Sequence, residues 1–281
     1  MPVPCLLVPK GAFVRTSPLA PALLPLSLLL AAVPAASPTD LPEIEARGSL
    51  RVIAAEGEQP EMFDFDGDPA KPGLEREMLE GFARLKRLKL EVVPVKAFSD
   101  RIPALLRGDG DVIVGLVDTA ERRKQIDFTA EVLPVRHIVV THKPGAPVRT
   151  VEELRKRKAG TIRGTTWARE TVAAGVPESQ VEYFPDTEPM LEALSVGRVD
   201  AVVMTLSDFV LATDRHPGLE GGILLGEPAH AAWGLRKRDA KLRAELDGYI
   251  ENLRSGASWN RLIVTYFGDK ALSALGRTTG R

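Results

Sequence analysis

Short runs of β-branched residues alternate with amphipathic segments along most of this chain, and this alternation constrains the fold more than any other feature. The apolar run at residues 50–54 is followed by apolar residues at helical spacing over 74–85 and by a second run at 90–95. Such alternation is typical of α/β folds with largely parallel strands. The sequence therefore predicts an α/β protein.

The alternation occurs in two cycles, which predicts two lobes. A second cycle begins at Thr150, where Thr150 and Glu153 form the Ser/Thr-x-x-Glu pattern that starts helices. Two extended passages, 139–143 and 230–235, are expected to join the two cycles as crossover strands. The helical tail has no strand of its own, so we expect it to return to the first lobe. Lobe one is expected to comprise residues 48–139 plus 230–281, and lobe two residues 140–229.

The first 36 residues differ in composition from the rest and predict a secretory signal peptide. Lys10 and Arg15 precede an apolar stretch that ends in small residues suited to a signal peptidase. Prolines interrupt this stretch, which is shorter than the roughly 20 residues of a membrane span. We therefore expect a periplasmic protein. The only cysteine, Cys5, would leave with the signal, so the mature protein would have no disulfide, thiolate nucleophile or Cys-based zinc site.

Charge and motif content exclude several classes of function. Acidic and basic residues are interspersed and the formal net charge is −1, so no global field favours nucleic acid. His137, His142, His216 and His230 lack metal-ligand spacing, and no nucleotide-binding or hydrolase motif occurs. We expect no metal site and no cofactor.

One segment carries a specific functional signal, residues 108–129, which read GDGDVIVGLVDTAERRKQIDFT. This segment resembles the motif of the periplasmic solute-binding proteins of the polar amino-acid ABC-transporter family. The segments that agree with the family elsewhere are 48–52, 98–105, 164–166, 197–203 and 259–268. The resemblance implies a type II periplasmic-binding fold, a monomer whose two lobes close around a small ligand, and an ABC permease or a membrane sensor as partner.

Gly115 and Arg122 define the first half of the expected site. Gly115 ends a buried strand at the carboxyl edge, where open α/β sheets bind ligands. Thr119 follows in the same motif, and Arg122 begins the next helix. A guanidinium there can hold a carboxylate through two parallel hydrogen bonds, and the resemblance implies this role for Arg122. The alternative is a surface arginine paired with Glu121 or Asp127.

The second half of the expected site is a turn between a strand and a helix. Gly164, Thr165 and Thr166 can direct backbone N–H groups and hydroxyls at an anion, and they resemble the family's other carboxylate contact. Phe98 and Phe63 could form apolar walls, although either could equally belong to the core.

Three departures from the family pattern bear on the ligand. Val117 stands where the family has a threonine, and Thr205 stands where it has the acid that balances the ligand's ammonium. An aromatic residue of the first lobe is also missing, and its segment instead contains Glu58, which with Glu56 could restore a negative charge. A buried ammonium without a counter-charge is costly, so a monocarboxylate or other organic acid fits better than an ordinary amino acid.

We therefore expect a binding protein for a small carboxylate ligand and not an enzyme, with two alternatives. A cyclohexadienyl-type dehydratase on the same fold would need an acid in the cleft, from Glu56, Glu58 or Asp208. An accessory protein with a degenerate cleft is the other alternative.

Overall fold

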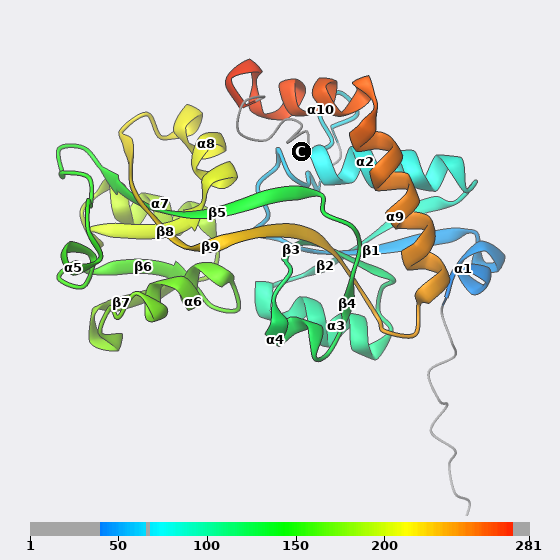
Figure 1. Cartoon of the computed structure of the whole chain (residues 1–281), viewed down its shortest axis with the longest axis horizontal. Helices are drawn as coiled ribbons and strands as arrows, with labels where there is room; N and C mark the ends of the chain where they lie inside the picture. The colour runs from blue at the N-terminus through cyan, green and yellow to red at the C-terminus, as the bar shows by residue number, and fades with distance from the viewer. Residues whose placement is uncertain (1–39, 66–67, 272–281) are drawn as a thin grey trace, which may run out of the picture. The chain divides into compact units, whose positions relative to one another are not determined.

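The computed structural model describes residues 40–65 and 68–271 (Figure 1). The expected signal peptide, residues 1–36, lies outside the described residues. The strands are β1 (Ser49–Ala55), β2 (Lys89–Val95), β3 (Val112–Val117), β4 (Asp127–Phe128), β5 (Leu133–His142), β6 (Ala159–Ile162), β7 (Val181–Phe184), β8 (Ala201–Thr205) and β9 (Leu219–Leu235).

Helices connect the strands, as the alternating pattern predicts. The helices are α1 (Leu41–Arg47), α2 (Leu74–Leu85), α3 (Arg101–Arg107), α4 (Ala120–Arg123), α5 (Val151–Leu154), α6 (Thr166–Ala173), α7 (Thr187–Ser195), α8 (Leu206–Arg215), α9 (Ala240–Ser255) and α10 (Ala257–Phe267). Three short 3₁₀ turns are η1 (Phe98–Asp100), η2 (Glu178–Gln180) and η3 (Asp269–Ala271). The predicted α/β class is confirmed.

The strands form one sheet in the order β2-β1-β3-β9-β5-β8-β6-β7, with β4 paired to β9. Strands β1, β2 and β3 are parallel at one end of the sheet, and β6, β7 and β8 are parallel at the other. Between these groups, the long strands β5 and β9 pair antiparallel and run from one group to the other (Figure 1). Both predicted crossover passages lie wholly or largely on these two strands.

The group around β1 packs against helices on both faces because its buried side chains alternate. Leu50 and Val52 face a large cluster that includes α2, α9 and α10, whereas Ile53 and Ile113 face a smaller cluster with Leu105 of α3. The C-terminal helices thus cover the strands at the start of the chain.

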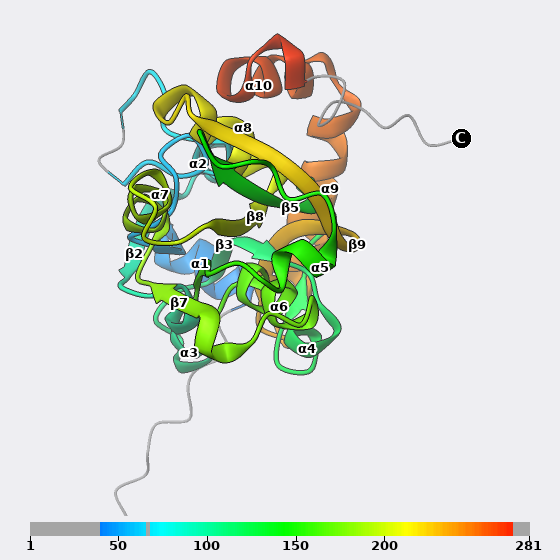
Figure 2. The same cartoon turned by 90° about the vertical axis from the view of Figure 1, so that its left-hand side faces the viewer.

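The group around β8 is covered on both faces in the same way. Val202 and Met204 point toward α7 and α8, while Ala201 and Val203 point toward the cluster that contains Leu154 of α5. In Figure 2, α8 and α6 lie on opposite sides of β8, as they also do in Figure 1. The two buried layers hold β8 rigidly, so the loops at its end have a fixed base.

The helical tail is divided into two helices, and one predicted boundary differs from the structure. The tail forms α9 and α10 because the chain leaves the helical conformation at Gly256, which has φ −92° and ψ 171°. Strand β9 begins at Leu219 and not at residue 230, because pairing with β5 extends the strand through a segment that has little apolar alternation. The lobe boundaries themselves stay a prediction.

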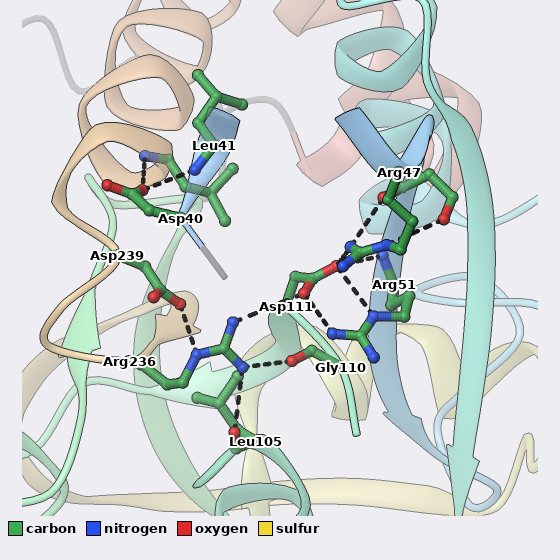
Figure 3. A network of polar contacts seen from close by, with 11 residues as sticks. Asp40, Leu41, Arg47, Arg51, Leu105, Gly110, Asp111, Arg236 and Asp239 are labelled. Carbon is green, nitrogen blue, oxygen red and sulfur yellow. Dashed lines mark hydrogen bonds and ion pairs between the residues drawn. The ribbon is translucent and has the colours of Figure 1, made fainter. Parts of the chain in front are cut away.

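A buried polar network connects the first strands to the chain near α9 (Figure 3). The fully buried Asp111 forms ion pairs with Arg47 and with Arg51, whose Nη2 lies 2.8 Å from Oδ1. Arg236, 4% exposed, lies between Asp111 and Asp239, at 3.6 Å and 2.8 Å respectively. This network stabilises the base of β3, the strand that leads to Gly115.

No helix within residues 40–65 and 68–271 combines the length and the apolar character needed to cross a membrane.

Candidate ligand-binding cleft

A cavity of about 80 Å³ lies where β3, β5 and β9 meet the loops that follow β1, β6 and β8. That volume is roomy enough for several water molecules or a small polar solute. The residues that line the cavity are Gly57, Glu58, Gln59, Met62, Glu75, Phe98, Arg101, Gly115, Val117, Arg122, Leu133, Val135, Thr165, Thr166, Trp167, Thr187, Thr205, Ser207, Asp208 and Ala231. Both strand groups contribute, so a ligand in this cavity would contact both.

Arg122 lines the cavity without a carboxylate partner among the described residues. Thr119 caps helix α4 by accepting a hydrogen bond from the Arg122 backbone N–H at 3.2 Å. The side chain donates from Nη1 to the Val117 carbonyl at 2.8 Å and from Nη2 to the Gly164 carbonyl at 2.9 Å. Burial lowers the pKa of Arg122 to about 9, with Arg101 as a further cause. A desolvated guanidinium in this position attracts an anion.

The turn after β6 reaches the cavity through two threonines. Thr165 caps α6, accepting from the Ala168 N–H at 3.3 Å while its hydroxyl donates to the Ile162 carbonyl at 2.6 Å. The Thr166 hydroxyl lies 2.7 Å from Nε2 of the buried His137. The hydroxyls therefore already have protein partners, and the N–H groups of the first turn of α6 are what this turn can offer to an anion.

Gly164 does not line the cavity but makes a close contact at its edge. Its φ is +78°, and a Cβ at this position would lie 2.9 Å from the backbone of Ser99. Gly115 also has positive φ, +64°, and lies in a register shift between β3 and β9. A Cβ on Gly115 would lie 2.9 Å from Oε1 of Glu58, so the glycine leaves room for that carboxyl.

Three carboxyl groups line the same cavity, of which Glu75 is buried and Glu58 and Asp208 are partly buried. Burial raises the pKa of Glu58 to about 8, that of Glu75 to about 7 and that of Asp208 to about 6, and in each case hydrogen bonds or a neighbouring arginine oppose the effect of burial. Glu75 accepts from the Gly115 N–H at 2.8 Å and from the Trp233 indole at 3.1 Å. Titratable groups with shifted pKa values in one cavity are typical of functional sites.

Arg101 compensates one of these carboxyls. It is 2% exposed, and its Nη1 donates to Glu58 Oε1 at 2.7 Å and to the carbonyls of Val114 and Gly115 at 3.0 Å and 3.2 Å. Its guanidinium also lies 4.8 Å from the centre of the Phe98 ring. The pair places a guanidinium and a carboxyl group next to Gly115.

The structure brings most of the predicted site residues together. Those that line the cavity are Glu58, Phe98, Gly115, Val117, Arg122, Thr165, Thr166 and Thr205. The expectation for Phe63 as a cleft wall is corrected: the side chain is 1% exposed and packs in the core with residues of α2. Thr119 acts as a helix cap, and Glu56, the second acid that could have restored charge, is exposed.

Three charged residues of the cavity were missed or underweighted by sequence reasoning. Asp208 brings a carboxyl to the cavity close to Thr205: Thr205 caps α8, and Asp208 follows three residues later, in the first turn. Glu75 and Arg101 were assigned to helices without a role. Both occupy positions on the apolar stripe of their helices, for example beside Ala104 and Leu105 on α3, and a charge on an apolar stripe was the available signal.

No group of three or more His, Cys, Asp or Glu side chains in the described part of the chain has the arrangement of a metal site.

The fold and the shared cavity define a two-lobed solute-binding protein. Residues 50–269 match the family model described as bacterial extracellular solute-binding proteins, family 3, and the chain belongs to this family.

Two curated relatives show the range of proteins that contain this kind of domain. The chain is 31% identical to the L-arginine-binding protein of Pseudomonas aeruginosa over 188 residues, which are 60% of this chain and 70% of that protein. It is 24% identical to the membrane-bound lytic murein transglycosylase F of Desulfosudis oleivorans over 200 residues, 69% of this chain and 44% of that protein. The chain spans about half the length of the transglycosylases that it matches.

Among solved structures, the P235GK mutant of ArgBP from T. maritima is similar with a TM-score of 0.73 and 24% sequence identity, covering 81% of this chain and 99% of that one. This likeness confirms the predicted two-lobed periplasmic-binding fold.

Proposed function

We propose that this protein binds a small zwitterionic ligand of the amino-acid type in the cleft, with Arg122 holding the carboxylate and Asp208 the ammonium. The observation that supports this most directly is that a guanidinium without a carboxylate partner among the described residues and a partly buried carboxyl line one cavity. Opposite charges at two points match a zwitterion and give it one orientation.

Asp208 removes the reason for preferring a ligand without an ammonium. An organic acid is the expected ligand if Thr205 leaves the cavity without an acid, but Asp208 brings a carboxyl to the cavity from one helical turn further along. Its Oδ2 is hydrogen-bonded to the Thr205 hydroxyl, so the two residues act together. The name of the P. aeruginosa relative is consistent with an amino-acid ligand.

We also propose that the closed form of the protein is recognised by a membrane permease or sensor. A ligand that binds both lobes favours the closed state by its higher affinity for that state. Export to the periplasm as a monomer belongs to the same proposal. The match to the murein transglycosylases covers about half of those proteins, so the proposal includes no murein chemistry.

A ligand screen tests the proposal. We would measure thermal shifts and titration calorimetry of residues 37–281 with the twenty L-amino acids and with 5-guanidinopentanoate, the analogue of L-arginine without the α-ammonium. Ligand at 100 times its dissociation constant should add about 2.7 kcal/mol of stability. We expect at least one amino acid to bind, and loss of binding in both Arg122→Met and Asp208→Asn. Absence of binding to every compound would contradict the proposal and favour an accessory protein with a degenerate cleft.

One observation favours a second candidate, a dehydratase-type lyase. Glu58 lines the cavity with a pKa of about 8, so it holds a proton near neutral pH and could act as a general acid. Prephenate-like compounds should be included in the screen and followed by absorbance. Consumption that Glu58→Gln abolishes would establish the enzyme, whereas stable binding without turnover would leave the binding protein.

A further inference from the structure

A chain of hydrogen bonds crosses the cleft from Arg215 through Gln59 to Asp208. Arg215 Nη2 donates to Gln59 Oε1 at 3.0 Å, and Gln59 Nε2 donates to Asp208 Oδ1 at 2.7 Å. Arg215 and Asp208 both belong to α8, whereas Gln59 lies in the loop after β1. Gln59 is therefore the link between the two sides.

We propose that Gln59 is a positioning residue that orients the Asp208 carboxylate and keeps it charged for recognition of an ammonium. This inference rests on the proposed role of Asp208 in ligand binding. In this role Gln59 acts on the ligand through Asp208.

The orientation of the Gln59 amide is determined by its two neighbours. Because Arg215 has only N–H donors, the amide oxygen must face Arg215, and the amide nitrogen must then face Asp208. Glu61 and Glu188 in turn hold Arg215 through ion pairs. Gln59 is only 5% exposed, so water cannot readily take the place of its amide group. A rigid donor is thus directed at the carboxylate.

The surroundings of Asp208 explain why this donor matters. Burial is the largest cause that raises the pKa of Asp208, and the negative charge of Glu61 raises it further. Two hydrogen bonds oppose this effect, one from the Thr205 hydroxyl and one from Gln59, and both lower the pKa of Asp208. Asp208 has no direct ion pair with an arginine or lysine among the described residues. Loss of Gln59 would remove one of the two hydrogen-bond donors that favour the charged form of Asp208.

The two supporting groups come from different sides of the cavity. Thr205 caps the same helix that contains Asp208, so this hydrogen bond persists whenever α8 is folded. Gln59 belongs to the opposite side, where its carbonyl accepts from the N–H groups of Met62 and Phe63 next to the first core. The charged form of Asp208 therefore depends on a hydrogen-bond donor from its own helix and on a second donor from the opposite side of the cavity.

The test compares Gln59→Met, which keeps the length of the side chain, with the control Gln125→Met on the surface. The probes are L-arginine and 5-guanidinopentanoate, which share every group except the α-ammonium. At about pH 5 we expect Gln59→Met to weaken L-arginine binding about tenfold and to change binding of the analogue less than twofold, because only L-arginine needs a charged Asp208 and a rise of one unit in its pKa from about 6 lowers the charged fraction about tenfold there. Equal weakening of both probes, or of neither, would overturn the inference.

The pH dependence of L-arginine affinity is a second measurement, and a general loss of packing would not change it. For the wild type, L-arginine affinity should fall as the pH drops through about 6, where Asp208 gains a proton. In Gln59→Met the fall should begin about one pH unit higher, because the charged form has lost a hydrogen bond. An unchanged profile would contradict the inference.

A measurement without ligand separates failure of this inference from failure of the proposed function. The side-chain carboxyl of Asp208 would be titrated by carbon NMR in the wild type and in Gln59→Met, with the signal assigned by its loss in Asp208→Asn. An upward shift of about one pH unit supports the inference even if no amino acid binds. Coincident titration curves overturn it even if L-arginine binds to the wild type.

Discussion

Arg122 donates a hydrogen bond from Nη2 to the carbonyl oxygen of Gly164 at 2.9 Å, which joins helix α4 to the turn after β6. The same guanidinium holds the Val117 carbonyl at the end of β3. Arg122 therefore contacts both sides of the cavity before any ligand is considered, and a carboxylate bound to it would strengthen a connection that the protein already makes.

Replacement of Arg122 should abolish carboxylate binding with little loss of folding. Arg122→Met removes charge-assisted hydrogen bonds worth about 1.5 to 3 kcal/mol each, so we expect affinity to fall at least about a hundredfold. Titration calorimetry with the best ligand of the screen measures this. Arg123→Met is the control, because Arg123 is exposed and pairs with Asp118 outside the cavity. Comparable losses in the two variants would show that Arg122 is not the anchor.

Gly57 should be essential for closure. A Cβ on Gly57 would lie 2.4 Å from Cβ of Asp186, the residue that precedes α7, so Gly57→Ala should hold the two sides apart and weaken ligand binding about tenfold or more. Asp186 is the N-cap residue of α7, and glycine is tolerated at helix N-caps. The double variant Gly57→Ala/Asp186→Gly should therefore regain most of the affinity. If it binds no better than Gly57→Ala, the contact is not what limits closure.

The carboxyls of the cavity should make stability fall as pH rises. The pKa of Glu58 is raised from its usual 4.5 to about 8, so between these values the folded protein holds a proton that the unfolded chain has lost. The contribution to the free energy of unfolding is full below about pH 4.5 and is lost toward pH 8, by at most about 1.4 kcal/mol per pH unit for one proton. Urea unfolding of Glu58→Gln should show a flatter profile over this range. The exposed Glu56→Gln should keep the wild-type slope, and equal slopes in all three proteins would refute the assignment.

Asp111 should contribute to stability and not to ligand recognition. Asp111→Asn leaves the buried Arg236 with one carboxylate, Asp239, and weakens the pairs to Arg47 and Arg51, so we expect a loss of about 3 kcal/mol in the free energy of unfolding (Figure 3). Chemical denaturation measures the loss. Asp109→Asn is the matched control, since Asp109 is exposed and pairs only with Arg107 in the contacts described. A change below 1 kcal/mol in Asp111→Asn would contradict this account.

Local patterns in the sequence were sufficient for the elements and for the family. Residues 74–85 repeat apolar side chains at helical spacing, and α2 has those bounds; Thr150 precedes Glu153 by three residues, and Thr150 caps α5. Such features depend on neighbours within one or two turns, so the sequence states them directly. The motif around Arg122 likewise placed this residue at the start of a helix after a buried strand.

The composition of the cavity depended on contacts between distant segments. Phe63 and Phe98 could not be distinguished by sequence, yet one packs in the core and the other lines the cavity. Asp208 approaches Gln59 across 149 positions of the chain, and Arg101 approaches Glu58 across 43. Periodicity indicates which face of a helix is buried, but it does not tell what the buried face meets.

The sequence by itself determined the α/β class, the two cycles, the family and the guanidinium of Arg122 at the carboxyl edge of β3. Only the tertiary structure decided that three carboxyls and a second arginine, Arg101, share the cavity with it. The physical reason is that the ionisation of Glu58, Glu75 and Asp208 is set by burial and by partners from other strands and helices, and these arise only when the chain has folded.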